Sequence, residues 1–544
     1  MASISETFQK SSGTTVPVWE ATCPQSSFPR FDALKKDTST SVCVIGGGIA
    51  GITTAYEIHR NLRKPVVLIE AREVLAGETA RTTGHLSSGD QGDRFYNLIK
   101  TFGESGAKLA YESHQYAVNR VGEISRELNI DCEYRKLPAK IIKAPEEEND
   151  LQDEYEATQK LGLPSSYNAS EQVGDLYKGP TLTVNDQGTF HPTKYLVGIL
   201  EYLKKQKDFT AYTQTRYVSH ERKDGKLQIS VKGASGADHT VSADSIVIAS
   251  NMPPRKISHV IKQHYMRSYV IAAPVAKDAY KDILLYDNKD PYVYVRLSEH
   301  SDPEKQYLIV GGEDHKVGIE DQSGYDAHFS NLEAWMRENF SKAGQVEYRW
   351  SGQVVENAEG LAYIGQSGDE QEYIVTGDNG NGLTHGTLAA KIITDQIAGT
   401  KNPWGEIYSP ARTPLSGGLG GIYETAKENI VQQKEYLRLV TITTGDIEDL
   451  KPCSGKVIRG PLTSGLKPLA VYKDQDGKVS KFSALCPHMK GVVAWNPIEQ
   501  SWDCPNHGSR FGGASGECVM GPAKMGLSPE NEAAEEEAKG SANV

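Results

Sequence analysis

Cysteine is scarce in this chain. Only seven of the 544 residues are cysteines, namely Cys23, Cys43, Cys132, Cys453, Cys486, Cys504 and Cys518. An odd and sparse set does not suit a disulfide framework, which small secreted domains build from many paired thiols. We therefore look for cysteines that bind a metal or take part in redox chemistry.

The sequence also lacks long hydrophobic runs and long basic runs. No stretch approaches the ~18 uninterrupted apolar residues of a membrane-spanning helix, and Met1–Lys10 has no apolar core of signal-peptide length. The 59 basic residues are outnumbered by 71 acidic ones, which gives a net charge of -12. Because an acidic chain repels phosphate backbones, we expect no nucleic-acid partner. We expect a cytoplasmic protein without a membrane partner.

The length and the composition divide the chain into parts. A chain of 544 residues is too long for one hydrophobic core, so about two to four domains are expected. Residues 1–40 are polar and predict an irregular lead-in. Residues 41–404 hold a large first unit, and residues 405–435, rich in Pro, Gly and Ser at their start, predict a linker. Residues 436–525 have short strands and turns, which indicates an all-β domain, and residues 526–544 form an acidic tail.

The first unit begins with a β-α-β pattern. Ser41–Ile45 predicts a short buried strand, Ile49–Leu62 a helix, and Val66–Ile69 a second strand. Such a unit makes parallel strands joined by a right-handed crossover. Beyond it, residues 100–185 predict mostly helix, and residues 210–250 predict hairpins that end in a buried strand. Further strands are expected over 265–350, and a strand, a turn and a helix over 373–397.

A glycine-rich turn lies between the first strand and the first helix. Gly46-Gly47-Gly48-Ile49-Ala50-Gly51 fits G-x-G-x-x-G, and Glu70 stands nineteen residues after Gly51, at the end of the next strand. Gly46 permits the tight turn, Gly48 lets a pyrophosphate approach the backbone, and Gly51 allows close helix packing. The helix N-terminus attracts phosphate, and Glu70 can accept hydrogen bonds from ribose hydroxyls. The pattern predicts a dinucleotide site.

Two further loops favour FAD over NAD. Only one fingerprint is present, which gives no sign of a nicotinamide site beside a flavin site. The small-residue loop Ala76–Gly84 contains Arg81-Thr82-Thr83-Gly84 and can run under a flavin. The turn Thr376–Gly386 opens a second helix, whose N-terminus could stabilise negative charge on a reduced flavin.

These segments resemble the D-amino-acid-oxidase-like (DAO) family of FAD-dependent amine oxidoreductases over about residues 41–400. The resemblance implies an α/β FAD-binding Rossmann-like domain (about 41–100, 186–255 and 355–400) with an α+β substrate domain (about 101–185 and 256–354), and hydride transfer from a C–N bond to the flavin. The FAD-binding residues that we predict are Gly46, Gly48, Ile49, Ala50, Gly51, Glu70, Ala71, Arg72, Gly77, Thr79, Arg81, Thr82, Thr83, Gly84, Val218, Ala249, Gly380, Gly382, Leu383 and Thr384.

A metal signature lies near the C-terminus. Cys486-Pro487-His488 is followed, after fifteen residues, by Cys504-Pro505-Asn506-His507. Two thiolates on one iron and two imidazoles on the other would hold a 2Fe-2S cluster, although Cys2His2 also suits zinc. The following Gly508-Ser509-Arg510-Phe511 resembles Rieske domains and favours the cluster over zinc. We therefore predict a C-terminal all-β Rieske domain whose ligands are Cys486, His488, Cys504 and His507.

Two departures separate this domain from the Rieske proteins of bc1 complexes. That class carries one extra cysteine in each ligand loop, joined as a disulfide, where this chain has Gly491 and Asn506. It also donates hydroxyl hydrogen bonds toward the cluster from positions that are Ser509 and Phe511 here. Fewer hydrogen bonds to the sulfurs stabilise the reduced cluster less, so we expect it to resemble low-potential, ferredoxin-like Rieske centres and not respiratory ones.

Candidate catalytic residues are less well marked. Arg296, on an alternating strand, could clamp a substrate carboxylate with two hydrogen bonds or form a surface salt bridge. His385 begins the helix after the second glycine turn, and Tyr269 may be a pocket or a core aromatic. His85 lies beside the flavin loop and raises the question of a covalent flavin link.

We predict an FAD- and 2Fe-2S-dependent enzyme that oxidises a C–N bond of a small amine or amino-acid-like substrate. Electrons would pass from flavin to cluster and then to an external acceptor protein. Two alternatives stay open: a reductase fed by an external donor, and a non-catalytic redox sensor or electron carrier. A Rieske oxygenase is disfavoured, because Lys256 stands where the iron-binding acid would precede His259 and His264.

Overall fold

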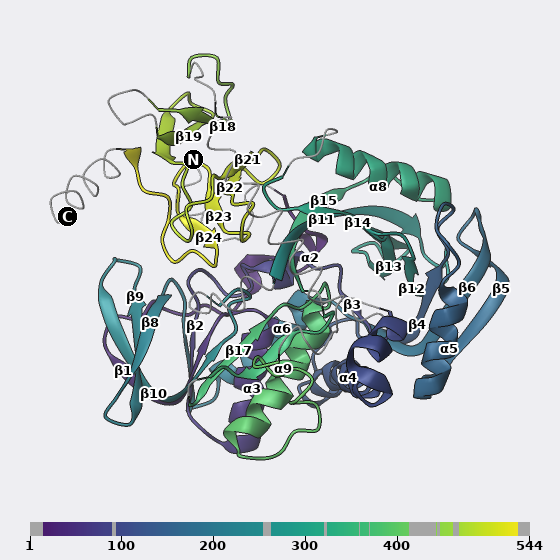
Figure 1. Ribbon diagram of the computed structural model, residues 1–544, viewed down its shortest axis with the longest axis horizontal. Coiled ribbons are helices and arrows are strands. Elements are labelled where there is room, and N and C mark those ends of the chain that lie inside the picture. The colour runs from purple at the N-terminus through teal and green to yellow at the C-terminus, as the bar shows by residue number, and fades with distance from the viewer. Residues whose placement is uncertain are drawn as a thin grey trace.

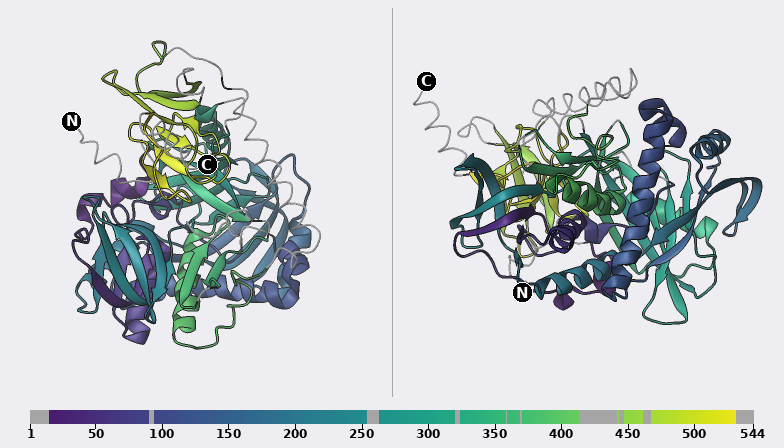
Figure 2. Two further views of the ribbon diagram at one scale, coloured as in Figure 1. Left: turned by 60° about the vertical axis from the view of Figure 1, so that its left-hand side comes forward. Right: turned by 90° about the horizontal axis from the view of Figure 1, so that it is seen from below.

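The computed structural model describes residues 15–89, 94–253, 263–319, 324–357, 359–368, 370–412, 442, 447–460 and 467–530. Two large sheets with their helices form the lower and right-hand parts of the molecule in Figure 1, and a smaller β domain, drawn in yellow, lies over both of them. The views in Figure 2 agree on this placement. Among the described residues, no helix has both the length and the apolar character needed to cross a membrane.

The first sheet is mainly parallel and has the order β16-β17-β10-β1-β2-β7, with β8 and β9 extending from β10. Its strands are β1 (Thr38–Ile45), β2 (Val66–Ile69), β7 (Phe209–Tyr212), β8 (Arg216–Lys223), β9 (Lys226–Lys232), β10 (Asp238–Ile248), β16 (Tyr363–Gln366) and β17 (Glu372–Thr376). Helix α3 (Ile49–Leu62) joins β1 to β2, which pair in parallel. The predicted β-α-β unit is therefore confirmed.

This sheet is covered on both faces. Val42 and Val44 of β1 pack in a core with helices α3, α6 (Pro192–Lys204) and α9 (Gly382–Ile397), whereas Cys43 and Ile45 pack with the β8–β9 hairpin. Covering on both faces explains why β1 and β2 read as continuous apolar runs.

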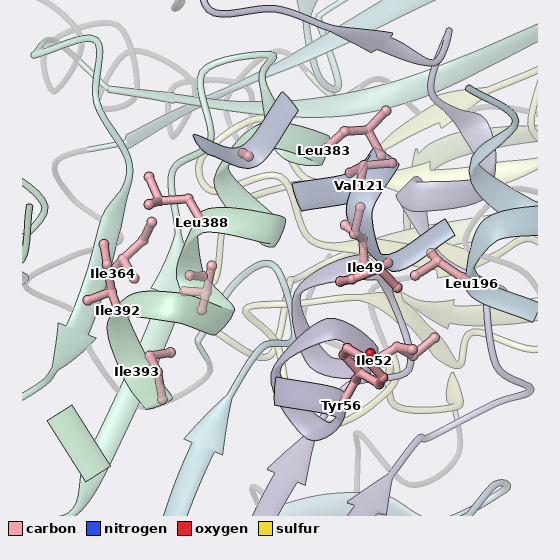
Figure 3. Packing of buried hydrophobic residues seen from close by; sticks show 14 of the residues in the cluster. Ile49, Ile52, Tyr56, Val121, Leu196, Ile364, Leu383, Leu388, Ile392 and Ile393 are labelled. Carbon is pink, nitrogen blue, oxygen red and sulfur yellow. The ribbon is translucent and has the colours of Figure 1, made fainter. Parts of the chain in front are cut away.

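Helices α3 and α9 pack closely on the helical side of the sheet. Ile49 and Ile52 of α3 and Leu388 and Ile392 of α9 are buried in this core (Figure 3). A Cβ on Gly386 would lie 2.8 Å from the Ile49 side chain and 3.2 Å from the Ala50 nitrogen. Glycine at this position therefore lets the first turn of α9 approach the first turn of α3, where the dinucleotide motif lies.

The second sheet has the order β15-β11-β14-β13-β12-β4-β6-β3, with β5 paired to β6. Its strands are β3 (His85–Leu86), β4 (Arg135–Ile142), β5 (Ser165–Val173), β6 (Tyr177–Thr189), β11 (Gln263–Ala276), β12 (Leu284–Asp287), β13 (Tyr294–Glu299), β14 (Lys305–Lys316) and β15 (Tyr348–Asn357). Helices α4 (Phe95–Glu127), α5 (Leu151–Leu161) and α8 (Tyr325–Asn339) accompany it.

The prediction of mostly helix over 100–185 is wrong in part. Helices α4 and α5 are present, but β4, β5 and most of β6 also fall in this range. Most of β5 is polar and exposed, and no apolar alternation marks it as a strand. It is a strand because it pairs with β6. Such pairing depends on tertiary structure, so the hydrophobic pattern of residues 165–173 does not reveal it.

The C-terminal domain is built from two small antiparallel sheets. They contain β18 (Ser454–Arg459), β19 (Pro468–Lys473) and β20 (Val479–Ser483), and β21 (Ala494–Asn496), β22 (Ser501–Asp503), β23 (Arg510–Gly512) and β24 (Cys518–Met520). Pro529 still forms a bridge with Phe482, and Lys481 lies 3.5 Å from Glu530. The β structure therefore continues past residue 525, into the predicted acidic tail, whose residues 531–544 lie outside the described part.

The start of the predicted linker packs against the first sheet. Tyr408 is buried, and its carbonyl accepts a hydrogen bond of 2.7 Å from the Ile364 nitrogen. The Arg412 guanidinium lies 4.1 Å from the centre of the Tyr363 ring and pairs with Glu359 at 2.5 Å. The remainder of the predicted linker, from residue 413, lies outside the described residues.

Three short helical segments lie near the start of the chain. Helix α2 (Val18–Thr22) and the 3-10 turn η1 (Gln25–Ser27) precede β1, and the 3-10 turn η2 (Glu78–Arg81) follows β2. Val18 and Trp19 of α2 are buried against β11 and β14. The expected irregular lead-in therefore contains an anchored helix.

Candidate functional site

A cavity of ≈ 330 Å³ lies where the two large sheets and the C-terminal domain meet. All three parts of the chain supply its wall. The first sheet and its loops contribute Gly46–Ala50, Glu70–Arg72 and Gly380–Leu383, the second sheet contributes residues such as Ser268, Tyr294 and Gln353, and the C-terminal domain contributes Val519–Gly521.

The glycine motif shapes one end of the cavity. Gly46 has a φ of +116° and lies so close to β10 that a Cβ there would be 2.4 Å from the Ala249 oxygen. A Cβ on Gly51 would be 1.9 Å from the Gly46 oxygen. Gly48 caps α3 and faces the cavity, and only the Thr79 hydroxyl, at 3.0 Å, would meet a Cβ there. The open approach at Gly48, over a helix N-terminus, fits a pyrophosphate.

The four predicted metal ligands lie together on two loops of the C-terminal domain. Cys486 and His488 follow β20, and Cys504 and His507 lie between β22 and β23. The two histidine rings are 5.0 Å apart, centre to centre. His488 Nδ1 is buried without a hydrogen-bond partner, and a hydrogen bond with Cys504 lowers the pKa of the Cys486 thiol. A thiol pair beside an imidazole pair fits the ligand set of a 2Fe-2S cluster.

Burial sets the protonation state of the two histidines in this set. Burial lowers the pKa of His488 and lowers that of His507 to about 4. Both imidazoles are therefore neutral near pH 7, the form in which histidine binds metal.

Comparison with known proteins agrees with both predicted cofactors. The model of the FAD dependent oxidoreductase family (DAO) matches residues 41–396, and that of the Rieske [2Fe-2S] domain matches residues 444–529. The chain belongs to the DAO family of FAD-dependent oxidoreductases. It carries a C-terminal Rieske domain, so its cofactors are FAD and a 2Fe-2S cluster.

Individual relatives match either nearly the whole chain or about 70% of it. YhfW of Bacillus subtilis (strain 168), named as a Rieske 2Fe-2S iron-sulfur protein, is 31% identical over 509 residues, which cover 92% of this chain and 94% of that one. Gamma-glutamylputrescine oxidoreductase of Escherichia coli (strain K12) is 21% identical, over 72% of this chain and 92% of its own. Glycine oxidase from Geobacillus kaustophilus has the same fold, with a TM-score of 0.57, 16% identity, and coverage of 69% and 99%.

Most of the FAD-binding residues that the sequence predicts line the cavity of this DAO-family chain. Glu70 Oε2 accepts a hydrogen bond of 2.7 Å from the Gly47 nitrogen, and Glu70 Oε1 accepts one of 2.9 Å from the Arg72 nitrogen. These bonds fix the carboxylate at the wall. The predicted residues in the lining are Gly46, Gly48, Ile49, Ala50, Glu70, Ala71, Arg72, Gly77, Thr79, Arg81, Thr82, Thr83, Ala249, Gly380, Gly382 and Leu383.

Four residues of the predicted FAD set are not part of the lining. Gly51 lies behind Gly46 and serves helix packing. Gly84, at a φ of +80°, leaves room for the Arg296 guanidinium, 2.4 Å from where its Cβ would be. Val218 is 36% exposed on β8, and Thr215, Arg216 and Tyr217 line the cavity in its place. Thr384 is buried, and its hydroxyl donates to the Asn381 oxygen at 2.9 Å.

The prediction of Arg296 as a substrate clamp does not fit the structure. Arg296 is buried outside this cavity, and its Nη1 donates to the carbonyl oxygens of Gly84 at 2.8 Å and Phe190 at 2.9 Å. Its guanidinium also lies 5.4 Å from the centre of the Trp19 ring. Burial lowers the pKa of Arg296 to about 9. These contacts hold the flavin loop and α2 against β13, and Arg296 lines a second cavity instead of this one.

The other two catalytic candidates are also engaged elsewhere. Tyr269 is buried in the core under α8, where its hydroxyl lies 2.9 Å from His315 Nε2. His385 lines the cavity, but its Nδ1 is 2.9 Å from the Asp378 oxygen and its Nε2 is 3.0 Å from His114 Nε2. Both ring nitrogens of His385 are therefore committed to protein groups, and this residue joins α9 to α4.

His85 lies in the cavity wall with both nitrogens occupied. Its Nδ1 is 2.9 Å from the Thr83 hydroxyl, and its Nε2 is 3.2 Å from the Val295 oxygen. A ring nitrogen held in this way has no lone pair directed at a flavin, which disfavours a covalent link. For the disfavoured oxygenase, His264 instead pairs with Glu356 at 3.0 Å, and Lys256 and His259 lie outside the described residues.

The sequence left several lining residues unassigned. They come from strands and loops of both large sheets and from the C-terminal domain, and share no local motif with the glycine turn. They include Glu78, Asn251, Met252, Ser268, Val270, Tyr286, Tyr292, Tyr294, Asp314, Gln353, Glu356, Asp378 and Val519–Gly521. Of these, Asp314 follows the glycine pair Gly311-Gly312, a signal that could have marked it.

The two departures from the bc1 class lie against each other in space. A Cβ on Gly491 would be 2.1 Å from the Asn506 side-chain oxygen, so the two loops touch at the point where that class has its disulfide. Packing of a glycine against an asparagine replaces the covalent link. The Ser509 hydroxyl hydrogen-bonds the Cys486 thiol, whereas Phe511 is buried and offers no hydroxyl.

The Rieske ligand loop is bonded to the cavity wall. Gln353, on β15, lines the cavity, and its Nε2 donates a hydrogen bond of 2.9 Å to the Gly508 oxygen, next to the ligand His507. A Cβ on Gly508 would be 2.6 Å from the Tyr265 ring, and one on Gly318 would be 2.8 Å from the Asp503 oxygen. These close approaches seat the ligand loop on the edge of the second sheet.

One buried carboxylate anchors the Rieske domain. Glu499, which is 0% exposed, lies 3.0 Å from Arg267 Nη2 and 3.3 Å from Arg81 Nη2, and accepts a hydrogen bond of 2.5 Å from the Ser351 hydroxyl. Burial works to raise the pKa of Glu499, but Arg81, Arg267 and Arg510 outweigh it and hold that pKa at about 2. The sequence predicts Arg81 only as part of the loop under the flavin, but this residue also links that loop to the Rieske domain.

Replacing Gly48 by valine should remove FAD and leave the cluster in place. A branched side chain would occupy the space that the pyrophosphate needs and would also meet the Thr79 hydroxyl. Flavin released by denaturation and measured by absorbance should fall to a small fraction of the wild-type amount, and the iron content should not change. Purification with a full complement of flavin would contradict the assignment of this turn to the cofactor.

Proposed function

We propose that the protein is a dehydrogenase that oxidises a C–N bond of a small amine or N-methylated amino acid. Electrons would leave the flavin through the Rieske cluster for an external acceptor protein. The observation that carries this proposal is the hydrogen bond between Gln353, in the wall of the flavin cavity, and Gly508, beside the cluster ligand His507. A cluster loop that is fixed at the flavin site would let electrons pass from the flavin to the cluster.

The two cofactors would supply complementary chemistry. FAD accepts a hydride as an electron pair, and a 2Fe-2S cluster accepts one electron at a time. The residues of the chain would hold the two groups next to each other. Gly48 and the N-terminus of α3 would bind the pyrophosphate, the loops around Thr83 and Gly382 would hold the flavin ring, and Glu499 fixes the Rieske domain beside them.

The relatives favour amine chemistry. Gamma-glutamylputrescine oxidoreductase and glycine oxidase are named for an amine and an amino acid. A dehydrogenase is preferred to an oxidase because oxygen can reoxidise a flavin without an iron–sulfur cluster. The built-in cluster therefore indicates an acceptor other than oxygen.

Anaerobic reduction by a panel of amines tests the proposal. A substrate should bleach the flavin absorbance first, and the electron paramagnetic resonance signal of the reduced cluster should follow. Reduced ferredoxin plus candidate acceptors forms the opposing arm. If reduced ferredoxin supports turnover and no amine bleaches the flavin, electrons run in the other direction and the proposal is wrong.

A further inference from the structure

The segment Gly311-Gly312-Glu313-Asp314 on β14 shapes the side of the cavity away from the dinucleotide turn. A Cβ on Gly311 would lie 2.2 Å from the Tyr294 ring, so glycine lets this ring lie flat on the neighbouring strand. Gly312 and Glu313 have φ values of +147° and +59°, and the register of β14 against β11 shifts here. Such a bulge re-aims the next side chain, and Asp314 enters the cavity wall.

Four aromatic rings line the same cavity, and one of them, Tyr294, interacts with Asp314. His85 lies 5.3 Å from Tyr286 and 5.6 Å from Tyr294, and Tyr292 lies 6.3 Å from Tyr286 and 5.5 Å from Tyr294, between ring centres. All four rings line the cavity. Adjacent rings are tilted or perpendicular, so no two of them stack face to face, and each contributes to the cavity wall. The Tyr292 hydroxyl would be 3.5 Å from a Cβ on Gly380, which places this ring beside the predicted flavin loop.

The acid of this wall carries its negative charge above about pH 7, because burial raises the pKa of Asp314 to about 7. Asp314 Oδ1 is buried and has no hydrogen-bond partner, and the Ser268 hydroxyl, which lies 2.6 Å from the Tyr294 hydroxyl, bonds the same carboxylate. Burial and the nearby Arg296 lower the pKa of His85 to about 3, so its ring is neutral. A neutral ring adds no positive charge to the site.

Three basic residues of the lining are bonded to the Rieske domain. Arg72 donates to the Val519 oxygen, Arg216 donates to the Cys518 oxygen at 3.1 Å, and Arg81 pairs with Glu499, all in the Rieske domain. Lys524 follows in that same segment. A substrate carboxylate beside Asp314 would therefore meet a like charge, and Arg296 is turned away from it.

We propose that His85, Tyr286, Tyr292 and Tyr294, closed by Asp314, form an aromatic cage for a small N-alkylated amine bound as its cation and carrying no carboxylate. This proposal rests on the proposed amine oxidation and names its substrate class. Ring faces attract an alkylated ammonium by cation–π interaction, and a carboxylate with one unpartnered oxygen supplies the opposite charge. Within the function proposed above, the cage favours simple amines over N-methylated amino acids as substrates.

Isothermal titration of the holoprotein with tetramethylammonium tests the cage. This cation cannot lose a proton or be oxidised, so its binding is measured without turnover. It should bind, whereas tert-butanol, a neutral molecule of similar shape, and benzoate, an anion, should bind at least tenfold more weakly. Absence of tetramethylammonium binding, or tighter binding of benzoate, would overturn the cage.

Paired variants separate the cage from general damage to the protein. Asp314→Asn should raise the dissociation constant of tetramethylammonium at least tenfold. Glu313→Gln removes the same charge one residue away, where the side chain bonds Asn331 at 2.9 Å, and should change it less than twofold. Tyr292→Leu should weaken binding about fivefold and Tyr292→Phe should not, because the phenyl ring keeps its face. Equal effects within either pair would overturn the proposal.

The same titration should depend on pH. Burial raises the pKa of Asp314 to about 7, the Ser268 hydroxyl opposes this, and the charged groups around it, Glu356, Asp290 and Glu313, are all acidic. Asp314 is therefore protonated below that pH, and tetramethylammonium should bind more weakly as the pH falls from about 8 to about 6. Asp314→Asn should abolish this dependence, and a flat profile in the wild type would count against the carboxylate.

The cage and the proposed function can fail separately. If tetramethylammonium binds as expected but no amine bleaches the flavin, the proposed oxidation is wrong and the cage stands. If amines bleach the flavin but neither variant pair differs in tetramethylammonium binding, the oxidation stands and the cage is wrong.

Discussion

Replacing Glu499 by alanine should release the Rieske domain from its place over the flavin cavity. The variant would leave Arg81 and Arg267 buried without the carboxylate that both of them contact. Removing one partner of a buried ion pair costs about 3–5 kcal/mol, because the remaining charge is uncompensated. Since each 1.4 kcal/mol is about a factor of ten, the docked population should fall by roughly a hundredfold or more relative to the undocked one.

Stopped-flow spectroscopy and limited proteolysis would detect this release. Substrate should still bleach the flavin at a near-normal rate, but cluster reduction should become much slower, and cleavage between the domains should become faster. Glu517→Ala, which removes an exposed acid from the same domain, is the matched control and should leave both rates unchanged. Cluster reduction at the wild-type rate in Glu499→Ala would show that this anchor is not needed for electron transfer.

The anchor also predicts how docking responds to acid. The pKa of Glu499 in the folded protein, about 2, is below its ordinary value of 4.5. The stabilisation that it contributes is therefore complete above about pH 4.5 and is lost as the pH falls toward 2. Docking should persist through mildly acidic conditions and then weaken, and Glu499→Gln should lack this part of the pH dependence.

Features that depend on neighbouring residues were visible in the sequence. The G-x-G-x-x-G turn can be recognised in the sequence because the strand before it and the helix after it pack closely. Only small residues such as Gly46 and Gly51 fit where they meet. The four cluster ligands could also be predicted, because each ligand loop carries two of them within three or four residues. The helix over 49–62 could be predicted because its apolar residues face one core.

Features that depend on residues far apart in the chain were not visible. Glu499 reaches Arg81 across more than four hundred residues, and nothing near either residue marks the pair. Arg296 fitted a carboxylate clamp by its place on an alternating strand, but only the fold shows that it points at the carbonyl oxygens of Gly84 and Phe190. A strand pattern gives the face on which a side chain lies, and the partner on that face comes from topology.

Replacing His507 by cysteine should disconnect the flavin from its acceptor without disturbing substrate oxidation. Thiolate can still bind iron, but it exchanges a neutral ligand for an anionic one, which disfavours reduction of the cluster. The potential should fall by on the order of 100 mV or more, since Rieske centres lie well above all-cysteine 2Fe-2S clusters. Reduced flavin would then have little driving force toward the cluster, and turnover with a one-electron acceptor should collapse.

Two measurements make this result interpretable. Iron analysis and redox titration must first show that the variant keeps its cluster at a lowered potential, and anaerobic mixing with substrate should show flavin bleaching at the normal rate. Ser509→Ala, which keeps all four ligands but removes the hydroxyl that bonds Cys486, should lower the potential by a smaller amount and slow turnover only partly. Unchanged turnover in His507→Cys, with its cluster present at lowered potential, would place the Rieske domain outside the electron path.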